Sequence, residues 1–188
     1  MVIAGVKLPT ESQQRLILTA RRALEGIVNR RPYRAGPCDD PLLKSVRYGA
    51  FVTLFNQDEL RGCVGTCRPS VSLQDTVIEM TEAAATRDHR VGPVHAAELP
   101  QICIDISVLS PLTQVSDPLA LEVGRHGLHL ACGRKRAVLL PQVAVEYDWD
   151  MKTFLEQTCL KADLPTDAWT WPQTRVSGFT ALVIEEKR

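Results

Sequence analysis

The first half of the chain contains two stretches in which apolar residues recur at helical spacing. The first extends to about Asn29, and Thr10 followed by Gln13 predicts a capping box at its start. The second begins at Ser72, a residue type that favours the N-cap position. The apolar residues on one face are Leu16, Ile17, Ala20, Leu24, Ile27 and Val28 in the first stretch, and Leu73, Val77, Met80 and Ala84 in the second. Both stretches are predicted to be amphipathic helices.

Alternation of apolar and polar residues, which is typical of half-buried strands, marks several further segments. The clearest is 102–109, where isoleucine and valine share one face and Cys103, Asp105 and Ser107 share the other. Residues 48–55 and a segment that starts at Leu60 form a predicted hairpin. Asp150 predicts the cap of a third helix. Further elements are predicted as strands at 119–123, 128–131, 137–140 and 176–186, the third helix at 151–161, and a loop at 30–41.

This irregular order of hairpins and helices predicts an α+β fold. We expect a mostly antiparallel sheet with flanking helices, arranged as a larger and a smaller lobe around a cleft. The 188 residues, of which 45% are hydrophobic, fit a single domain over 1–188 or one domain with a small subdomain.

Composition excludes some classes of protein. The 22 Lys and Arg residues balance the 22 Asp and Glu residues, whereas nucleic-acid-binding proteins usually carry a basic excess. The N-terminal segment 1–7 is too short to be the hydrophobic region of a signal sequence, and no stretch of apolar residues approaches the length that spans a bilayer. We therefore expect a cytoplasmic protein with no membrane partner, whose six cysteines are reduced thiols.

The segment Leu60–Thr66, with the sequence LRGCVGT, carries the main candidate chemistry. In a regular strand, Arg61, Cys63 and Gly65 would share one face. A cation beside a thiol favours the thiolate, so Cys63 is a candidate nucleophile and Arg61 a candidate binding residue. Glycines in a strand indicate a close approach to the backbone, so Gly62 and Gly65 are candidate binding positions. The alternative is an ordinary hairpin strand with a buried cysteine and an arginine paired to a carboxylate.

The same segment resembles the signature of the AMME chromosomal region protein family, whose prokaryotic members are named AmmeMemoRadiSam system protein A. The resemblance covers nearly the whole chain. The other strings that fall in the family's order are Ser107–Pro111, Arg125–Leu128, Leu139–Ala144, Trp149–Asp150 through Phe154–Leu155, Cys159–Ala162, and Leu164–Pro165 through Trp169. The resemblance implies a Memo-like protein and a radical-SAM protein as partners, beside an unknown small molecule.

Four more polar residues match family strings and are expected to bind a ligand. Asp88 and Arg90 occupy a string that usually reads Asp-Pro-Arg-Phe, although this chain lacks the proline and the phenylalanine. Gln142 and Glu146 follow Pro141 in the family's Pro-Gln-Val-Ala string. A glutamine beside apolar strand residues either faces a cleft or satisfies backbone groups.

His126 lies in a turn between two glycines, where an exposed side chain is expected. A histidine near its ordinary pKa can exchange protons at neutral pH, so His126 is a candidate acid–base catalyst. The alternative is a turn histidine that bonds the local backbone.

No metal site and no cofactor are predicted. Cys63 and Cys67 have C-x3-C spacing, but no third cysteine follows, and zinc sites usually show C-x2-C or a matching second pair. His126, His129, Cys132 and Cys159 would complete a site only if the fold collected them.

The leading hypothesis is a cytosolic accessory or catalytic protein in which a cleft holds the candidate residues and Cys63 captures a small anionic or carbonyl-bearing substrate. A second hypothesis is a non-catalytic protein-interaction module. Nucleic-acid binding is the third, and zero net charge with few aromatic residues argues against it. We predict that Cys63 is the most reactive thiol, because Cys103 and Cys159 lie in apolar segments that should shield them.

Overall fold

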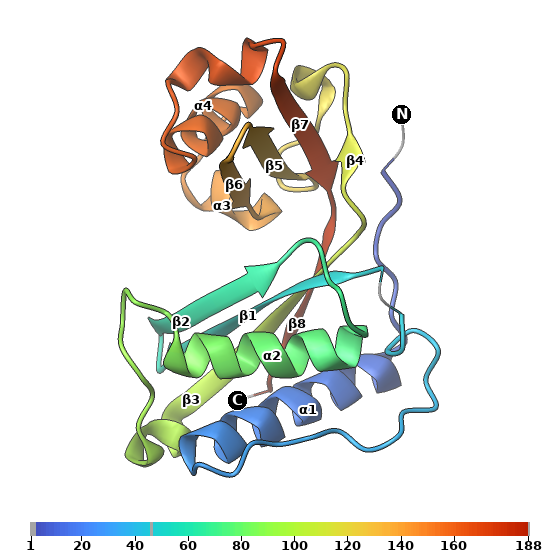
Figure 1. The fold of residues 1–188 in the computed structure, drawn as a ribbon, viewed down its shortest axis with the longest axis vertical. Helices are drawn as coiled ribbons and strands as arrows, with labels where there is room; N and C mark the ends of the chain where they lie inside the picture. Colours follow the sequence, from blue (N-terminus) through green and yellow to red (C-terminus); the bar gives the residue numbers. More distant parts are fainter. Residues whose placement is uncertain (1–2, 46, 188) are drawn as a thin grey trace. The chain divides into compact units, whose positions relative to one another are not determined.

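The structure is a computed structural model that describes residues 3–45 and 47–187, and it divides into two compact units (Figure 1). The larger unit comprises Lys7–Leu109 with residues 182–187, and the smaller unit comprises Ser110–Ala181 with residues 3–6. Each unit contains a four-stranded sheet, and the sheets have strand orders β2-β1-β3-β8 and β4-β7-β5-β6. The prediction of an α+β fold with antiparallel sheets and flanking helices is confirmed. The single-domain expectation and the cleft stay predictions.

The elements of the larger unit are α1 (Thr10–Val28), β1 (Gly49–Asn56), β2 (Glu59–Thr66), α2 (Leu73–Thr86), the 3-10 helix η1 (Ala96–Gln101), β3 (Ile102–Leu109) and β8 (Ala181–Glu185). Those of the smaller unit are β4 (Thr113–Gln114), η2 (Pro118–Ala120), β5 (Gly127–Cys132), β6 (Lys135–Leu139), α3 (Pro141–Glu146), α4 (Met151–Lys161), η3 (Thr166–Thr170) and β7 (Thr174–Phe179).

Helices α1 and α2 lie side by side against one face of the sheet in the larger unit (Figure 1). The strands bury their apolar alternate residues on this face, where Val52 and Leu54 of β1 and Ile104 of β3 are inaccessible to solvent. Burial of these side chains supplies the main driving force for packing the helices on the sheet. The opposite face, called the second face below, is only half-buried and carries Phe51, Thr53, Cys63, Cys103 and Asp105.

Strand β2 is an edge strand with an irregularity inside the motif. Phe55 of β1 pairs with Leu60, whereas Leu54 pairs with Gly62, so Arg61 is an extra residue without a partner in β1. Such a bulge bends a strand and re-aims a side chain. Because of the bulge, Arg61 and Cys63 no longer follow the regular alternation that would place their side chains on the same face of the strand.

The long loop after α1 is ordered by contacts at both ends. The N–H of Arg31 donates to the carbonyl of Gly26 at 2.7 Å, and the hydroxyl of Ser12, near the start of α1, donates to the carboxylate of Asp40 at 2.6 Å. This hydrogen bond lowers the pKa of Asp40, against the effect of burial. The loop therefore returns along the helix from its C-terminal to its N-terminal end.

Helix starts were predicted with mixed success. Ser72 caps α2 by accepting from Asp75 N–H at 3.1 Å, and Asp150 caps α4 by accepting from Thr153 N–H at 2.7 Å, so both predictions are confirmed. The predicted cap at Thr10 is wrong, because Pro9 occupies the N-cap position without a side-chain bond.

Two predicted strands differ in the structure. Residues 119–123 are not a strand, because Pro118 begins a 3-10 turn that the side chain of Asp117 caps. Residues 176–186 form two strands, β7 and β8, which lie in different sheets and are separated at Thr180. Gln142 lies in helix α3, which begins at a proline whose missing N–H costs nothing at that position.

Candidate functional site on strand β2

Arg61 is anchored by Glu98 and by the loop after α2. Its Nε and Nη2 atoms donate to the two carboxylate oxygens of Glu98 at 2.6 and 3.0 Å, and the same guanidinium donates to backbone carbonyls at residues 91–93. The pairing with Arg61 lowers the pKa of Glu98 from 4.5 to about 2, against the opposing effect of burial. Arg61 thus ties the loop after α2 to the bulge in β2, and its proposed role in activating the thiol finds no support in this geometry.

Asp88 and Arg90 hold the backbone of Cys63. One oxygen of the buried Asp88 carboxylate accepts from the N–H of Cys63 at 2.8 Å, and Nη2 of Arg90 donates to the carbonyl of Cys63 at 3.2 Å. Asp88 and Arg90 also form an ion pair at 2.6 Å. The arginine and the N–H group hold the pKa of Asp88 well below its usual range. Side chains therefore occupy the backbone groups that an edge strand would otherwise leave open.

Both glycines of the motif are required by packing within the chain. A side chain at Gly62 would meet the backbone carbonyl of Ala84 in α2 at well under 3.0 Å. A side chain at Gly65 would collide with the ring of Phe51, which lies over it on the second face. The close approach predicted from the sequence is real, but helix α2 and a phenylalanine make it.

The thiol of Cys63 lies on the second face within a row of polar residues. Cys63 is directly opposite Thr53 of β1, which is in turn opposite Asp105 of β3. The hydroxyl of Thr53 lies 3.3 Å from the sulfur of Cys63. Because Asp88 and Arg90 fix the main chain, the half-buried thiol has a defined position on the sheet.

The remaining predicted site residues belong to the smaller unit. His126 is buried, so the expectation of an exposed side chain is wrong: its Nδ1 accepts from the N–H of Glu122 at 3.0 Å. Burial and the nearby Arg125 lower the pKa of His126, which favours the neutral form of the ring. Gln142 is half-buried and Glu146 is exposed, both on α3. Their catalytic or binding roles stay predictions.

The burial of the cysteine side chains agrees only in part with what the sequence predicts. Cys159 is buried, and desolvation raises its pKa. Cys103 was expected to be shielded, but it is half-buried because it lies on the second face of the sheet. Among the described residues, no group of three or more His, Cys, Asp or Glu side chains could hold a metal ion.

Sequence reasoning missed three residues that surround the motif. Glu98, the partner of Arg61, lies in a 3-10 helix 37 positions away and has no local signal. Thr53 lies beside the thiol, and Asp105 beside Thr53, only through strand register. Asp105 did carry a signal, since a carboxylate inside an otherwise apolar strand is unusual.

These features define a class of two-unit α+β protein whose edge strand is clamped by two ion pairs. The AMMECR1 family model matches residues 17–184, and the chain belongs to this family. Protein TK0174 of Thermococcus kodakarensis is 40% identical over 182 residues, covering 92% of this chain and 89% of that protein. A protein of Methanothermobacter thermautotrophicus is 39% identical over 185 residues, covering 95% and 96%.

A solved structure shows the same fold. The crystal structure of uncharacterized protein PH0010 from Pyrococcus horikoshii superposes with a TM-score of 0.89 at 35% identity, covering 97% of this chain and 95% of that one. No helix in the described part of the chain is long and apolar enough to cross a membrane.

Proposed function

We propose that this protein is a cytosolic accessory or catalytic protein that acts with a Memo-like protein and a radical-SAM protein, with the thiol of Cys63 as its functional group. The partners rest on the resemblance of the sequence motifs. The thiol rests on one observation: Arg61, Gly62 and Gly65 are engaged in packing or ion pairing, and so is the backbone of Cys63. The sulfur itself accepts from the Thr53 hydroxyl at 3.3 Å and also interacts with the Arg90 guanidinium.

The surroundings of the thiol fit reversible capture of a small carbonyl compound. The sulfur adds to the carbonyl carbon, the carbonyl π electrons move to the oxygen, and that oxygen takes up the proton that the thiol gives up. The Thr53 hydroxyl, 3.3 Å from the sulfur, can pass or orient that proton. Arg90 supplies a cation near the sulfur, because its pKa is raised first by Asp88 and also by its interactions with the Cys63 side chain. A cation in this position can stabilise the negative charge that develops during the addition.

The test uses the protein with the Memo-like and radical-SAM proteins of the same organism. Sedimentation velocity of the mixture is compared for the wild type, Cys63→Ser and Cys38→Ser, the last a half-buried thiol of the same unit that serves as a matched control. Native mass spectrometry of the protein in the presence of a small aldehyde measures the reversible adduct at the thiol. We expect the wild type and the control variant Cys38→Ser to form the complex and to capture the aldehyde. Cys63→Ser should lose the complex, the capture, or both. Absence of any complex overturns the partners, and unchanged capture by Cys63→Ser overturns the thiol.

The alternative, a non-catalytic interaction module, is favoured by the packing roles of Arg61 and the two glycines. In that case the exposed edge of β2 is the contact surface, and Leu60, which is 44% exposed, is its most accessible apolar side chain. Leu60→Ser would then weaken partner binding, whereas Cys63→Ser would leave binding unchanged. Nucleic-acid binding has no such support, because the net charge is zero.

A further inference from the structure

The end of α1 builds a basic hollow that the β2 site does not use. Asn29 is the C-cap, and Arg30 follows in the left-handed region with φ 58°. The N–H of Arg30 donates to Ile27 and the N–H of Arg31 donates to Gly26, the hydrogen-bond pattern of a Schellman motif. The motif reverses the chain so that residues 31–34 run back beside the helix.

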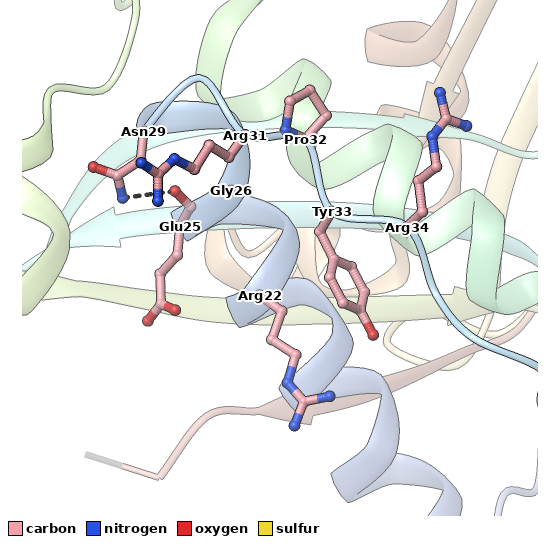
Figure 2. A pocket seen from close by; sticks show the side chains of 8 residues that line it. All are labelled: Arg22, Glu25, Gly26, Asn29, Arg31, Pro32, Tyr33 and Arg34. Carbon is pink, nitrogen blue, oxygen red and sulfur yellow. Dashed lines mark hydrogen bonds between the residues drawn. The ribbon is translucent and has the colours of Figure 1, made fainter.

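Gly26 lets the returning segment lie directly against α1. A side chain at Gly26 would come within 3.0 Å of the carbonyl oxygen of Arg31 and the nitrogen of Tyr33. The close approach leaves a hollow of about 690 Å³ between the helix end and the segment (Figure 2). Its lining consists of Arg22, Glu25, Gly26, Asn29, Arg31, Pro32, Tyr33 and Arg34.

Three guanidinium groups border this hollow without a fixed partner. Arg22, Arg31 and Arg34 are all exposed, and none forms a side-chain hydrogen bond or ion pair with the residues that the structure describes. Arg61, by contrast, is saturated by one carboxylate and three carbonyls. A guanidinium group that forms no ion pair is a strong hydrogen-bond donor to an anion, and these three arginines line the same hollow.

The charges around the hollow favour an anion. Glu25 is the one carboxylate of its lining, set against three arginines. Burial raises the pKa of Glu82 in α2, against the opposing effects of Arg87 and Arg34. The ring of Tyr33 lies between Arg22 and Arg34 in Figure 2 and offers a flat surface to a planar group.

We propose that this hollow binds the phosphate group of a small phosphorylated compound with a planar ring. A phosphate has acceptor oxygens that guanidinium forks can engage from different sides, and the arginines line the hollow from both the helix and the returning segment. Their guanidinium groups point in different directions in Figure 2, so binding requires these exposed side chains to turn toward the hollow. The site is independent of the proposed function of Cys63. A nucleic acid is the less fitting occupant, because the chain as a whole has no basic excess.

The first experiment titrates the wild-type protein with inorganic phosphate, adenosine monophosphate and adenosine, followed by NMR of backbone amides and arginine Nε–H groups. We expect shifts confined to residues 22–34 with both phosphates, tighter binding of the monophosphate, and no shift with adenosine. Shifts spread evenly over all exposed arginines, or none near the hollow, overturn the proposal. A single-stranded oligonucleotide that binds where neither small phosphate does also overturns it.

The second experiment tests which arginines are responsible. Replacing the three arginines of the hollow by alanine should weaken binding of the monophosphate at least about tenfold. The matched control replaces Arg134, Arg136 and Arg175, which are also exposed and change the net charge equally. Equal weakening by the two triple variants would show a general charge effect and refute the site. Thermal unfolding of each variant separates loss of binding from loss of folding. Tyr33→Ala is a second test, because it should weaken binding of the monophosphate but leave binding of inorganic phosphate unchanged.

Discussion

The ion pair between Arg61 and Glu98 should be a main determinant of the stability of the larger unit. The perturbation is Glu98→Gln, which keeps the shape of the side chain and removes its charge. The two side chains are only 15% and 22% exposed, so solvent screens the pair weakly. Lowering the pKa of Glu98 from 4.5 to about 2 corresponds to about 3 kcal/mol of stabilisation when the carboxylate is ionised. We expect Glu98→Gln to lower the free energy of unfolding at pH 7 by about 2–3 kcal/mol.

The lowered pKa of Glu98 also predicts how the destabilisation by Glu98→Gln changes with pH. The folded state holds the pKa of Glu98 below its ordinary value, so its contribution is present above pH 4.5 and is lost as the pH falls toward 2. The difference between wild type and Glu98→Gln should therefore be constant near neutrality and shrink in acid. Urea denaturation followed by far-UV circular dichroism measures it at each pH, and hydrogen exchange of residues 59–66 and 91–101 locates it.

A matched control is Glu11→Gln, which removes the carboxylate of an exposed pair with Arg15 on α1. This variant should scarcely change the denaturation midpoint, because water screens the pair. The reasoning is refuted if Glu98→Gln costs less than about 1 kcal/mol at pH 7. It is also refuted if the cost is the same at pH 7 and pH 2.5, since the carboxylate would then contribute through shape alone.

Three further outcomes follow from the geometry of β2. Gly62→Ala should lower the free energy of unfolding by about 1–3 kcal/mol, because the new side chain would collide with a carbonyl of α2. Gly36→Ala, with open space around the residue, should change the free energy of unfolding little, and equal effects of the two variants in thermal denaturation would contradict the packing role of Gly62. Asp88→Ala should remove about 1.5–3 kcal/mol and speed hydrogen exchange at the amide of Cys63; an unchanged exchange rate there would rule out the clamp. Limited alkylation with peptide mapping should label Cys63 first and Cys159 last; early labelling of Cys159 would contradict its burial and raised pKa.

The sequence by itself determined the local elements and the family. Periodicity placed α1, α2 and β3, and the capping residues Ser72 and Asp150 marked where two helices begin, because these signals depend on neighbours within one or two turns. The rare string around Cys63 was sufficient to indicate the AMMECR1 family. It also showed that the backbone of that strand is closely approached.

The tertiary structure decided which atoms make that approach. Register put Thr53 beside Cys63, and packing put α2 against Gly62. The fold also gave Arg61 a carboxylate partner 37 residues away, which turned a candidate activating group into a structural anchor. Pairings of this kind depend on strand register and on the return path of loops, and neither leaves a periodic signal in the chain. For the same reason, the sequence predicted only a loop over 30–41, and the fold showed that residues 31–34 line a hollow beside α1.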